Sequence, residues 1–424
     1  GYKSDGFISK AEYDAALADS LTVVEDSTVN DLYDMPSAVE TVLDDAVTEL
    51  LADRGLEDTS ENRSAVRREI QEGGYHIYST IDPEIQNIVE DVLYNWEDYP
   101  KLADPSDEYA SSTQAIQPQA ACVIYDYTSG EIRAVVGSRT PQTQFLVLNR
   151  ATDSNMPVGS SIKPLGVYAP AMEAGLILPS SAEDDTPFQQ NSDGTLWPVN
   201  DEGYYSGLTD VDTAMTHSLN TVAVKVLAQL GLENSYDFLT EKFGITTLVK
   251  DYETSTGVTR SDLNYAPLAL GGLTKGVTTL EMAAAYASFP RDGLYSSPYL
   301  YTVVTDSTGK ILLSNGDYSV KVDENGNAVI TGQPTSTAIL SQATTFYMNQ
   351  MLQHVVTDGT GKLAKLSNMT AAGKTGTTTN DYDRWFVGYT PYYTAAVWSG
   401  YDRQERINSA GNPSCILWQK GMSA

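Results

Sequence analysis

Cysteine and histidine are scarce in this 424-residue chain, which holds 2 Cys and 3 His. Cys122 and Cys415 exclude a disulfide framework or a Cys-rich metal site, and we expect two buried free thiols rather than a pair. His76, His217 and His354 are far apart and lack metal-ligand spacing. We therefore expect no metal and no cofactor. A serine hydrolase that used a histidine base would also have few candidates here.

Basic residues are few as well, since 26 Lys+Arg stand against 56 Asp+Glu for a formal net charge of −30. Binding to nucleic acid or anionic lipid needs clustered Lys and Arg, so the composition argues against both. Residues 1–115 hold 27 Asp+Glu and 7 Lys+Arg, a net of −20, whereas residues 116–424 hold 29 and 19, a net of −10. This shift predicts an accessory region over 1–115 and a main domain over 116–424.

Long apolar runs are also missing, because no window approaches the ~20 apolar residues that a membrane span needs. The first residue is Gly rather than Met, and we expect this chain to be a fragment of something longer.

Periodicity predicts an α+β fold. In the first part, helical spacing predicts helices within 37–55 and 80–96, the second with Asp82 as N-cap and Pro83 at its first position. A strand is expected within 73–81 and a polar linker over 97–119. In the main domain we expect one helix to begin near Ser160 and another to follow Asn220. A third should begin at a capping box formed by Thr278 and Glu281, and a fourth should lie within 335–359 and end at Gly359.

Strands are expected at both ends of the main domain, as a hairpin within 120–138 and as strands within 369–379, 384–390 and 393–401. Strands at both ends with helices between them predict one antiparallel sheet covered by helices, in which the first and last strands pair.

The stretch "PVGSSIKPLGVY", residues 157–168, holds two serines and a lysine. On a helix, residues three apart share a face and residues two apart do not. Ser160 lies three before Lys163, so its hydroxyl can meet the lysine amine, whereas Ser161 should point elsewhere. Pro164 is tolerated only in a first turn, which places the helix start near Ser160.

Two further short motifs follow, Ser218-Leu219-Asn220 and Lys374-Thr375-Gly376-Thr377. Each motif alone is weak, and Ser-x-Asn is most often a turn or cap. The ordered set of three is typical of penicillin-binding proteins and class A β-lactamases.

The three motifs make chemical sense together. A serine hydroxyl needs a neighbour to take its proton, and Lys163 can do so only when its amine is neutral. Burial and the positive charge of Lys374 would both lower the pKa of Lys163. Ser218 can then relay a proton to a leaving amine, and Asn220 can hold Lys163 and a substrate amide.

The last motif supplies binding groups. The Thr377 N–H, with that of Ser160 near a helix N-terminus, would form an oxyanion hole. Gly376 would let a substrate backbone approach closely. The hydroxyls of Thr375 and Thr377, with Lys374, suit a terminal carboxylate.

The resemblance to class A, bifunctional penicillin-binding proteins extends beyond the motifs. It covers "QAACVIYDYTSGEIRAVVGSR", "LALGGLTKGVTTLEMAAAYASFPRDGLYSSP" and "AAGKTGTTTNDYDRWFVGYTPYYTAAVWSGYD", which resemble the transpeptidase domain. "GFISKAEYDAAL" resembles the tail of an upstream glycosyltransferase domain, which is missing here, and "YHIYSTIDPEIQ" the interdomain linker. The resemblance implies the serine β-lactamase/penicillin-binding-protein fold after a small α+β linker region.

It also implies a function. Such an enzyme is anchored outside the bacterial cytoplasmic membrane and crosslinks peptidoglycan. Its donor stem peptide ends in D-Ala-D-Ala, the acyl-enzyme forms on Ser160, an amine on another stem is the acceptor, and β-lactams acylate the same serine. Other cell-wall synthesis proteins would be its partners. A DD-carboxypeptidase and a catalytically silent β-lactam receptor or scaffold remain as alternatives.

A β-lactamase is disfavoured. Those enzymes use a Glu in a Glu-x-x-x-Asn stretch to position hydrolytic water. Here the nearest similar stretch is "RSDLN", in which Arg260 would take the Glu position if Asn264 takes that of the Asn. We also expect Asp383 and Arg384 to form a local ion pair.

Overall fold

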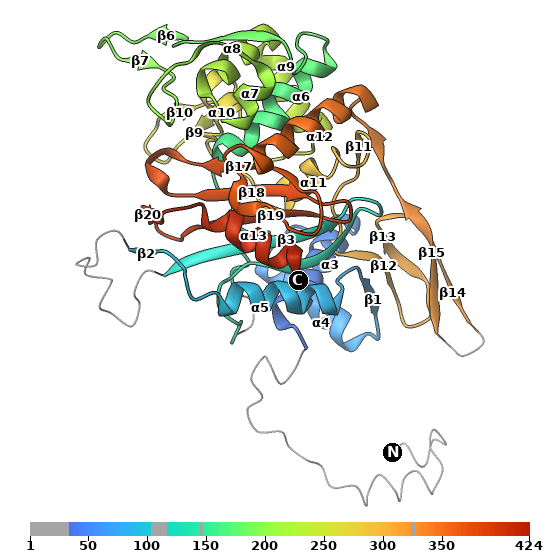
Figure 1. The fold of residues 1–424 in the computed structure, drawn as a ribbon. Coiled ribbons are helices and arrows are strands. Elements are labelled where there is room, and N and C mark those ends of the chain that lie inside the picture. The colour runs from blue at the N-terminus through green and yellow to red at the C-terminus, as the bar shows by residue number, and fades with distance from the viewer. Residues whose placement is uncertain (1–33, 103–116, 145–146, 324–326) are drawn as a thin grey trace, which may run out of the picture.

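The computed structural model describes residues 34–102, 117–144, 147–323 and 327–424. At its centre lies a five-stranded antiparallel sheet in the order β17-β18-β19-β3-β4 (Figure 1). Its strands are β3 (Pro118–Asp126), β4 (Glu131–Val136), β17 (Ala372–Thr377), β18 (Arg384–Tyr389) and β19 (Thr394–Tyr401). The expected strands are thus confirmed, and so is the pairing of the first with the last, in which Ala396 lies opposite Val123.

Both faces of this sheet are covered, and successive residues of a strand pack into different clusters. Val123 and Ala396 face one apolar core, whereas Cys122 and Val397 face a second. Helix α11 (Thr279–Tyr286) packs against β3, β18 and β19, with Tyr286 in the first core, while α5 (Pro83–Asn95) and α13 (Pro413–Ser423) contribute to the second. The α+β fold is therefore confirmed, and both cysteines are buried free thiols.

Local signals placed several helices correctly. The Asp82 carboxylate caps α5 by accepting from the backbone N–H of Glu84, and Pro83 is its first residue. Thr278 and Glu281 form the expected capping box of α11. Helices α3 (Pro36–Asp53) and α8 (Asn220–Leu230) also lie where periodicity predicts them.

Two expected helices differ from the structure. Helix α12 runs over Gln342–Thr357, later than predicted, because Ser341 caps it and β16 (Thr337–Ala338) pairs with β11 (Leu294–Tyr295). At Ser160 the chain forms a 3-10 turn, η1 (Gly159–Ile162), then a π-helical turn, η2 (Pro164–Tyr168), and only then α6 (Ala169–Glu173).

The N-terminal part contributes helices and one strand. Helix α4 (Ser60–Glu72) packs beside α3, and β1 (His76–Ser79) joins a three-stranded sheet with β12 (Tyr301–Thr305) and β13 (Ile311–Ser314). The boundary expected near residue 115 and the segment "GFISKAEYDAAL" lie outside the described residues. Both interpretations stay predictions.

The remaining elements are peripheral to the sheet. A long hairpin projects from the body at the right of Figure 1, and its strands are β14 (Gly316–Val322) and β15 (Ala328–Pro334). The others are short: β2 (Lys101–Leu102), β5 (Ala182–Asp185), β6 (Gln189–Gln190), β7 (Leu196–Trp197), β8 (Gly207–Asp210), α7 (Val211–Thr216), α9 (Leu232–Asp237), η3 (Phe238–Lys242), β9 (Tyr252–Glu253), β10 (Thr259–Arg260), α10 (Tyr265–Leu270), η4 (Lys362–Ala364), η5 (Thr379–Asp381) and β20 (Ile407–Asn408).

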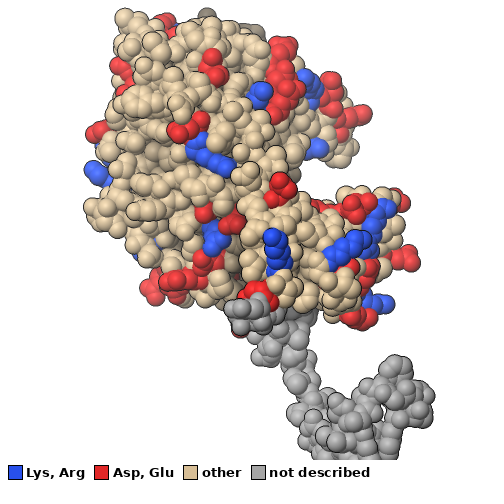
Figure 2. Space-filling model, turned by 90° about the vertical axis from the view of Figure 1, so that its right-hand side faces the viewer, with Lys and Arg blue, Asp and Glu red and all other residues tan. Residues whose placement is uncertain are grey.

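Acidic and basic side chains are interspersed on the face shown in Figure 2, which carries no continuous basic area and is hollowed between an upper and a lower lobe. Within the described ranges, no helix combines the length and the apolar character needed to cross a membrane.

Candidate active site

The two adjacent serines point in different directions. Ser161 is fully buried, its Oγ donates to the Val158 carbonyl at 2.7 Å, and its own carbonyl accepts from Tyr286 Oη at 2.6 Å. Ser160 is half-buried and lines a surface groove. The structure therefore gives solvent access to Ser160 and holds Ser161 in the core.

Glycines bring η1 against the edge strand β17. A Cβ on Gly376 would overlap the Val158 carbonyl oxygen and lie 3.0 Å from Ser161 Oγ. Gly159 has φ +53, and a Cβ there would lie 2.8 Å from the backbone nitrogen of Thr377. Gly376 is thus required because the η1 turn of the same chain packs against it. The sequence had instead suggested that a substrate backbone approaches this glycine.

Replacing Gly376 with alanine should therefore destabilise the fold. The methyl group would push η1 off β17, and overpacking of this kind costs about 1–3 kcal/mol. We expect a lower thermal unfolding temperature than for the control Gly272→Ala, because a Cβ on Gly272 meets nothing within 4 Å. Equal unfolding temperatures for the two variants would contradict this account of the glycine.

Lys163 lies beneath the groove with its side chain fully buried. Its Nζ donates to the Ser218 carbonyl at 2.7 Å and to Asn220 Oδ1 at 2.6 Å, and it lies 3.2 Å from Ser218 Oγ. Carbonyl oxygens only accept hydrogen bonds. A neutral Lys163 amine would therefore donate its two N–H groups to these two oxygens, and its lone pair could accept a hydrogen bond from a hydroxyl. In the described part of the chain, Ser160 Oγ is not among the hydrogen-bond partners of Lys163; such bonds are often long before substrate arrives.

Ser218 connects the two lysines. It adopts φ +61, which is rare for a residue with a side chain, and its Oγ accepts from Lys374 Nζ at 2.9 Å. Lys374 is also fully buried, and its Nζ donates to the Thr375 carbonyl at 3.2 Å. The three motifs that lie far apart in the sequence thus meet in one hydrogen-bonded chain from Lys163 through Ser218 to Lys374.

Burial changes the proton affinity of both amines. It lowers the pKa of Lys163 well below its usual value, the charge of Lys374 lowers this pKa further, and the Asp201 carboxylate opposes both effects. Burial also lowers the pKa of Lys374 to about 7, again against the opposing field of Asp201. A neutral Lys163 beside a partly protonated Lys374 is therefore accessible near neutral pH.

A buried lysine of this kind should cost stability. Lys374 binds its proton less tightly in the folded chain, with a pKa near 7, than in the unfolded chain, where the ordinary value is 10.5. The unfolded chain thus holds more protons between these two pKa values, and wild-type stability rises with pH across that window. Below it the penalty is greatest.

We therefore expect Lys374→Met to raise the unfolding temperature by roughly 2–4 °C, the shift for about 1 kcal/mol in a large domain. The gain should be largest at and below pH 7 and shrink toward pH 10. Lys420→Met, at an exposed lysine of α13, is the matched control. A stabilisation of Lys374→Met that grew with pH would contradict the lowered pKa.

Asn220 is held in one orientation by residues that carry no motif. Its Nδ2 donates to the Val199 carbonyl at 2.8 Å, which turns Oδ1 toward Lys163, and its backbone N–H donates to Asn200 Oδ1 at 2.8 Å. Asn200 is buried and in turn donates to Asp185. No sequence signal pointed to Asn200 or Asp185, because both act from loops and short strands distant in the chain.

The groove has a volume of about 310 Å³. Four motif residues line it, namely Ser160, Ser218, Thr375 and Thr377. The other lining residues were not predicted as part of the site from the sequence: Asp201, Thr360, Arg384, Ser409, Ala410, Gly411 and Asn412. Thr375 Oγ1 lies 2.7 Å from Thr360 Oγ1. Neither Arg260 nor Asn264 lines the groove; Arg260 belongs to β10 and Asn264 caps α10.

The expected ion pair between Asp383 and Arg384 is wrong. Asp383 accepts from Trp398 Nε1 at 3.0 Å, whereas Arg384 pairs with Asp381 at 3.0 Å. Neighbouring residues of an extended chain point to opposite sides, which separates the two side chains.

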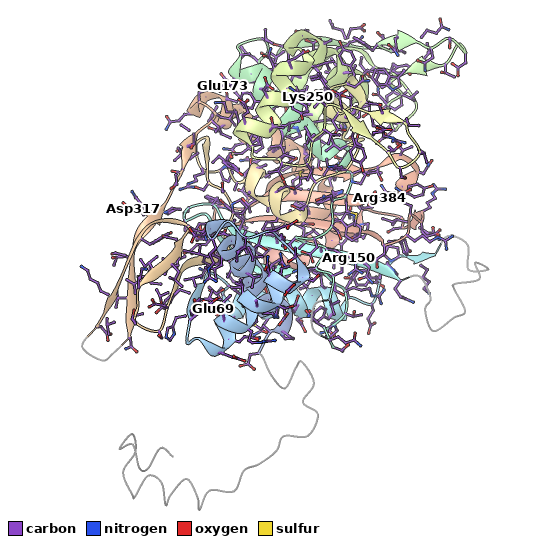
Figure 3. The ribbon with its side chains drawn as sticks, turned by 180° about the vertical axis from the view of Figure 1, so that it is seen from behind. Glu69, Arg150, Glu173, Lys250, Asp317 and Arg384 are labelled. Atoms are coloured by element: carbon purple, nitrogen blue, oxygen red, sulfur yellow. The ribbon has the colours of Figure 1, made fainter. Side chains whose placement is uncertain are left out.

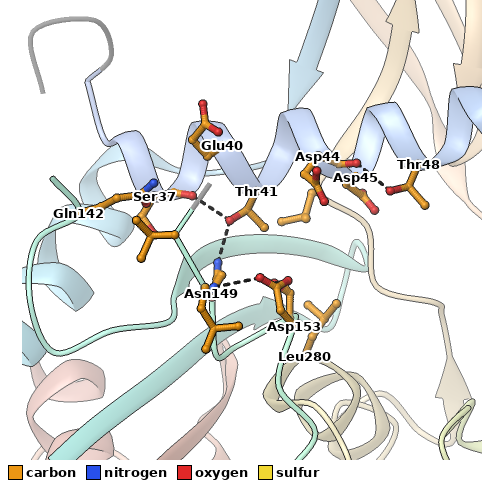
Figure 4. Close-up of a pocket in the computed structure, with 14 residues that line it drawn as sticks. Ser37, Glu40, Thr41, Asp44, Asp45, Thr48, Gln142, Asn149, Asp153 and Leu280 are labelled. Carbon is orange, nitrogen blue, oxygen red and sulfur yellow. Dashed lines mark hydrogen bonds between the residues drawn. The ribbon is translucent and has the colours of Figure 1, made fainter. Parts of the chain in front are cut away.

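A larger cavity of about 520 Å³ lies between α3 and the segment around Asn149 (Figure 4). Asn149 Nδ2 donates to Thr41 Oγ1 on α3, and the Asn149 backbone N–H donates to Asp153 within its own segment. The lining of this cavity includes several carboxylates but none of the motif residues, whereas Ser160, Ser218, Thr375 and Thr377 line the smaller groove. The smaller groove is therefore the candidate active site.

An antiparallel sheet covered by helices, with a serine-lined groove at its edge strand and two buried lysines bonded to Ser218, is the arrangement of the penicillin-binding transpeptidases. The family model described as "Penicillin binding protein transpeptidase domain" matches residues 120–406. The chain belongs to this family, and it corresponds to the transpeptidase region of the class A penicillin-binding proteins.

Known relatives support this assignment. Penicillin-binding protein 1A of Clostridium acetobutylicum is 37% identical over 359 residues, which cover 82% of this chain and 40% of that protein. The penicillin-binding protein PonA1 of Mycobacterium tuberculosis has a solved structure with a TM-score of 0.67 at 22% identity, covering 91% of each chain. PonA1 in complex with penicillin V also has a TM-score of 0.67, at 20% identity, covering 92% of this chain and 93% of that one. The chain thus spans about 40% of the length of the first curated relative.

Proposed function

We propose that this chain is a serine DD-transpeptidase that crosslinks peptidoglycan. Ser160 would attack the carbonyl of a stem peptide ending in D-Ala-D-Ala, form an acyl-enzyme and release the last D-Ala. An amine on another stem would then take the acyl group. β-Lactams would acylate the same serine. In the parent class A protein this chemistry would occur at the outer face of the bacterial cytoplasmic membrane, beside a glycosyltransferase domain.

One observation carries the proposal. Ser160 opens onto the groove that Ser218 also lines, and Ser218 is hydrogen-bonded to the two buried lysines, Lys163 and Lys374. Such an arrangement offers a nucleophile, a base with a lowered pKa and a path for the proton. The histidines do not compete for the role, because none of them lines the groove.

In the acylation step, the Ser160 Oγ–carbon bond forms while the proton of the hydroxyl passes to neutral Lys163. Collapse of the tetrahedral intermediate breaks the carbon–nitrogen bond to the terminal D-Ala, and the leaving amine receives the proton through Ser218. The backbone N–H groups of Ser160 and Thr377 would stabilise the oxyanion, which the close packing of Gly159 on Thr377 supports.

Deacylation is where a transpeptidase differs from a hydrolase. Among the described residues that line the groove, Asp201 is the one carboxylate and there is no Glu. Asp201 is exposed and accepts from Asn220 Nδ2 at 3.4 Å. The lack of a dedicated buried base for water favours an acyl-enzyme that survives until an amine arrives.

The test is product analysis with a stem-peptide analogue ending in D-Ala-D-Ala, with and without an amine acceptor. We expect D-Ala release to rise with acceptor concentration and the aminolysis product to dominate. Ser160→Ala is the control for release by any other route. Release with only the hydrolysis product would indicate a DD-carboxypeptidase, and no release from a chain that penicillin still acylates would indicate a silent receptor or scaffold.

A further inference from the structure

The groove presents one cationic side chain to a ligand, and it is Arg384 rather than either lysine. Lys163 and Lys374 are fully buried and do not line the groove. Among the described lining residues Arg384 is the only Lys or Arg, and its side chain is 18% exposed. It begins β18 and is labelled in Figure 3. The charge available to an anionic ligand at this surface is therefore that of the guanidinium.

Arg384 also determines the direction in which the Thr377 hydroxyl can form hydrogen bonds. It lies opposite Thr377 in the ladder, and its Nη1 donates to Thr377 Oγ1 at 2.9 Å. A guanidinium has only donors, so Thr377 Oγ1 accepts in this bond and its own hydrogen is free to be donated elsewhere. Since Thr377 also lines the groove, that hydrogen is available to a carboxylate of a bound ligand.

The guanidinium is held in place from its other side. Arg384 Nη2 pairs with Asp381 at 3.0 Å, and Asp381 also pairs with Arg406 at 3.2 Å. Asp381 has φ +61, so the turn before β18 keeps a strained backbone around this contact. Arg384 Nε is buried with no partner among the described residues. The guanidinium is therefore held between Thr377 on one side and Asp381 on the other.

We propose that Arg384 is a specificity-determining residue that selects donor peptides and β-lactams with a free carboxylate next to the reacting bond. It does so through its own remaining N–H groups and by holding Thr377 as a hydrogen-bond donor. The inference rests on the proposed function, and it moves the accessible positive charge of the carboxylate site from Lys374 to Arg384.

The experiment compares acylation by benzylpenicillin with acylation by its methyl ester, measured as second-order rate constants from intact mass. We expect Arg384→Ala to slow reaction with the acid by about 10- to 100-fold, the range for losing a charge-assisted hydrogen bond. Reaction with the ester should change less than about threefold, so the acid-to-ester ratio collapses. Arg384→Lys should restore part of the acid-to-ester ratio, because lysine keeps the positive charge but lacks the planar set of N–H donors of a guanidinium.

The ester serves as an internal check that the variant is folded and that Ser160 still reacts. Arg406→Ala is the matched control, since it removes the other partner of Asp381 from a side chain outside the groove, and it should leave the ratio unchanged. An equal loss for acid and ester, or an unchanged ratio in Arg384→Ala, overturns the inference while the proposed function stands. If the unsubstituted chain is acylated by neither compound, the proposed function itself fails.

Discussion

Ser160→Ala abolishes covalent labelling by a fluorescent penicillin, whereas Ser161→Ala leaves labelling in place; this is the largest effect that the structure predicts. Ser160 is the serine that opens onto the groove, and Ser161 is fully buried with its hydroxyl bonded to Val158. Without a nucleophilic oxygen at position 160, no acyl bond can form. Fluorescence of the protein band after denaturing electrophoresis measures the outcome.

The Ser161 variant is the matched control because it removes the same atom one residue away. It should lower the unfolding temperature slightly, since a buried hydrogen bond is lost. Labelling that survives in Ser160→Ala, or that vanishes in a folded Ser161→Ala, would reverse the assignment of the two serines.

Lys163→Ala should slow acylation by about 2–4 orders of magnitude, the range for loss of a general base. The amine lies next to Ser218 and Asn220, and burial lowers its pKa well below the usual value. Stopped-flow or quenched acylation with a penicillin gives the rate. Lys365→Ala, at an exposed lysine, is the control and should acylate like the unsubstituted chain.

The pH dependence tests the same lysine independently. The base must be unprotonated, so the acylation rate should rise as pH passes the pKa of Lys163 and level off above it. Because this pKa is lowered, the plateau should be reached well below the ordinary lysine value of 10.5. A rate that still climbs tenfold per pH unit near pH 10 would contradict a base with a lowered pKa.

The sequence predicted the sheet well because its strands carry strong local signals. In β19 every residue is buried, and its sequence holds the apolar stretch from Ala395 to Trp398, while β17 carries the Lys-Thr-Gly motif. Helix α4 was missed because it buries only Val66 and Ile70, too few apolar positions to reveal a period. The region around Ser160 was expected as a regular helix, but Pro164 lacks an N–H, and the chain passes through 3-10 and π turns instead.

The candidate site was predictable to the extent that short motifs carry it. Residues Lys163, Ser218 and Lys374 were expected to meet, and hydrogen bonds join them in the structure. Asn200 and Arg384 were not expected to matter, because what matters is their tertiary position: one orients Asn220, and the other lies across a strand pair from Thr377. The catalytic roles of the motif residues stay predictions.

The most direct measurement is the intact mass of this chain after incubation with benzylpenicillin, followed by peptide mapping of the adduct. We expect a mass increase equal to one whole penicillin molecule, carried by the tryptic peptide that contains Ser160, with fragment ions that assign it to that residue. An adduct on any other residue, or a folded chain whose mass does not change, would contradict this expectation.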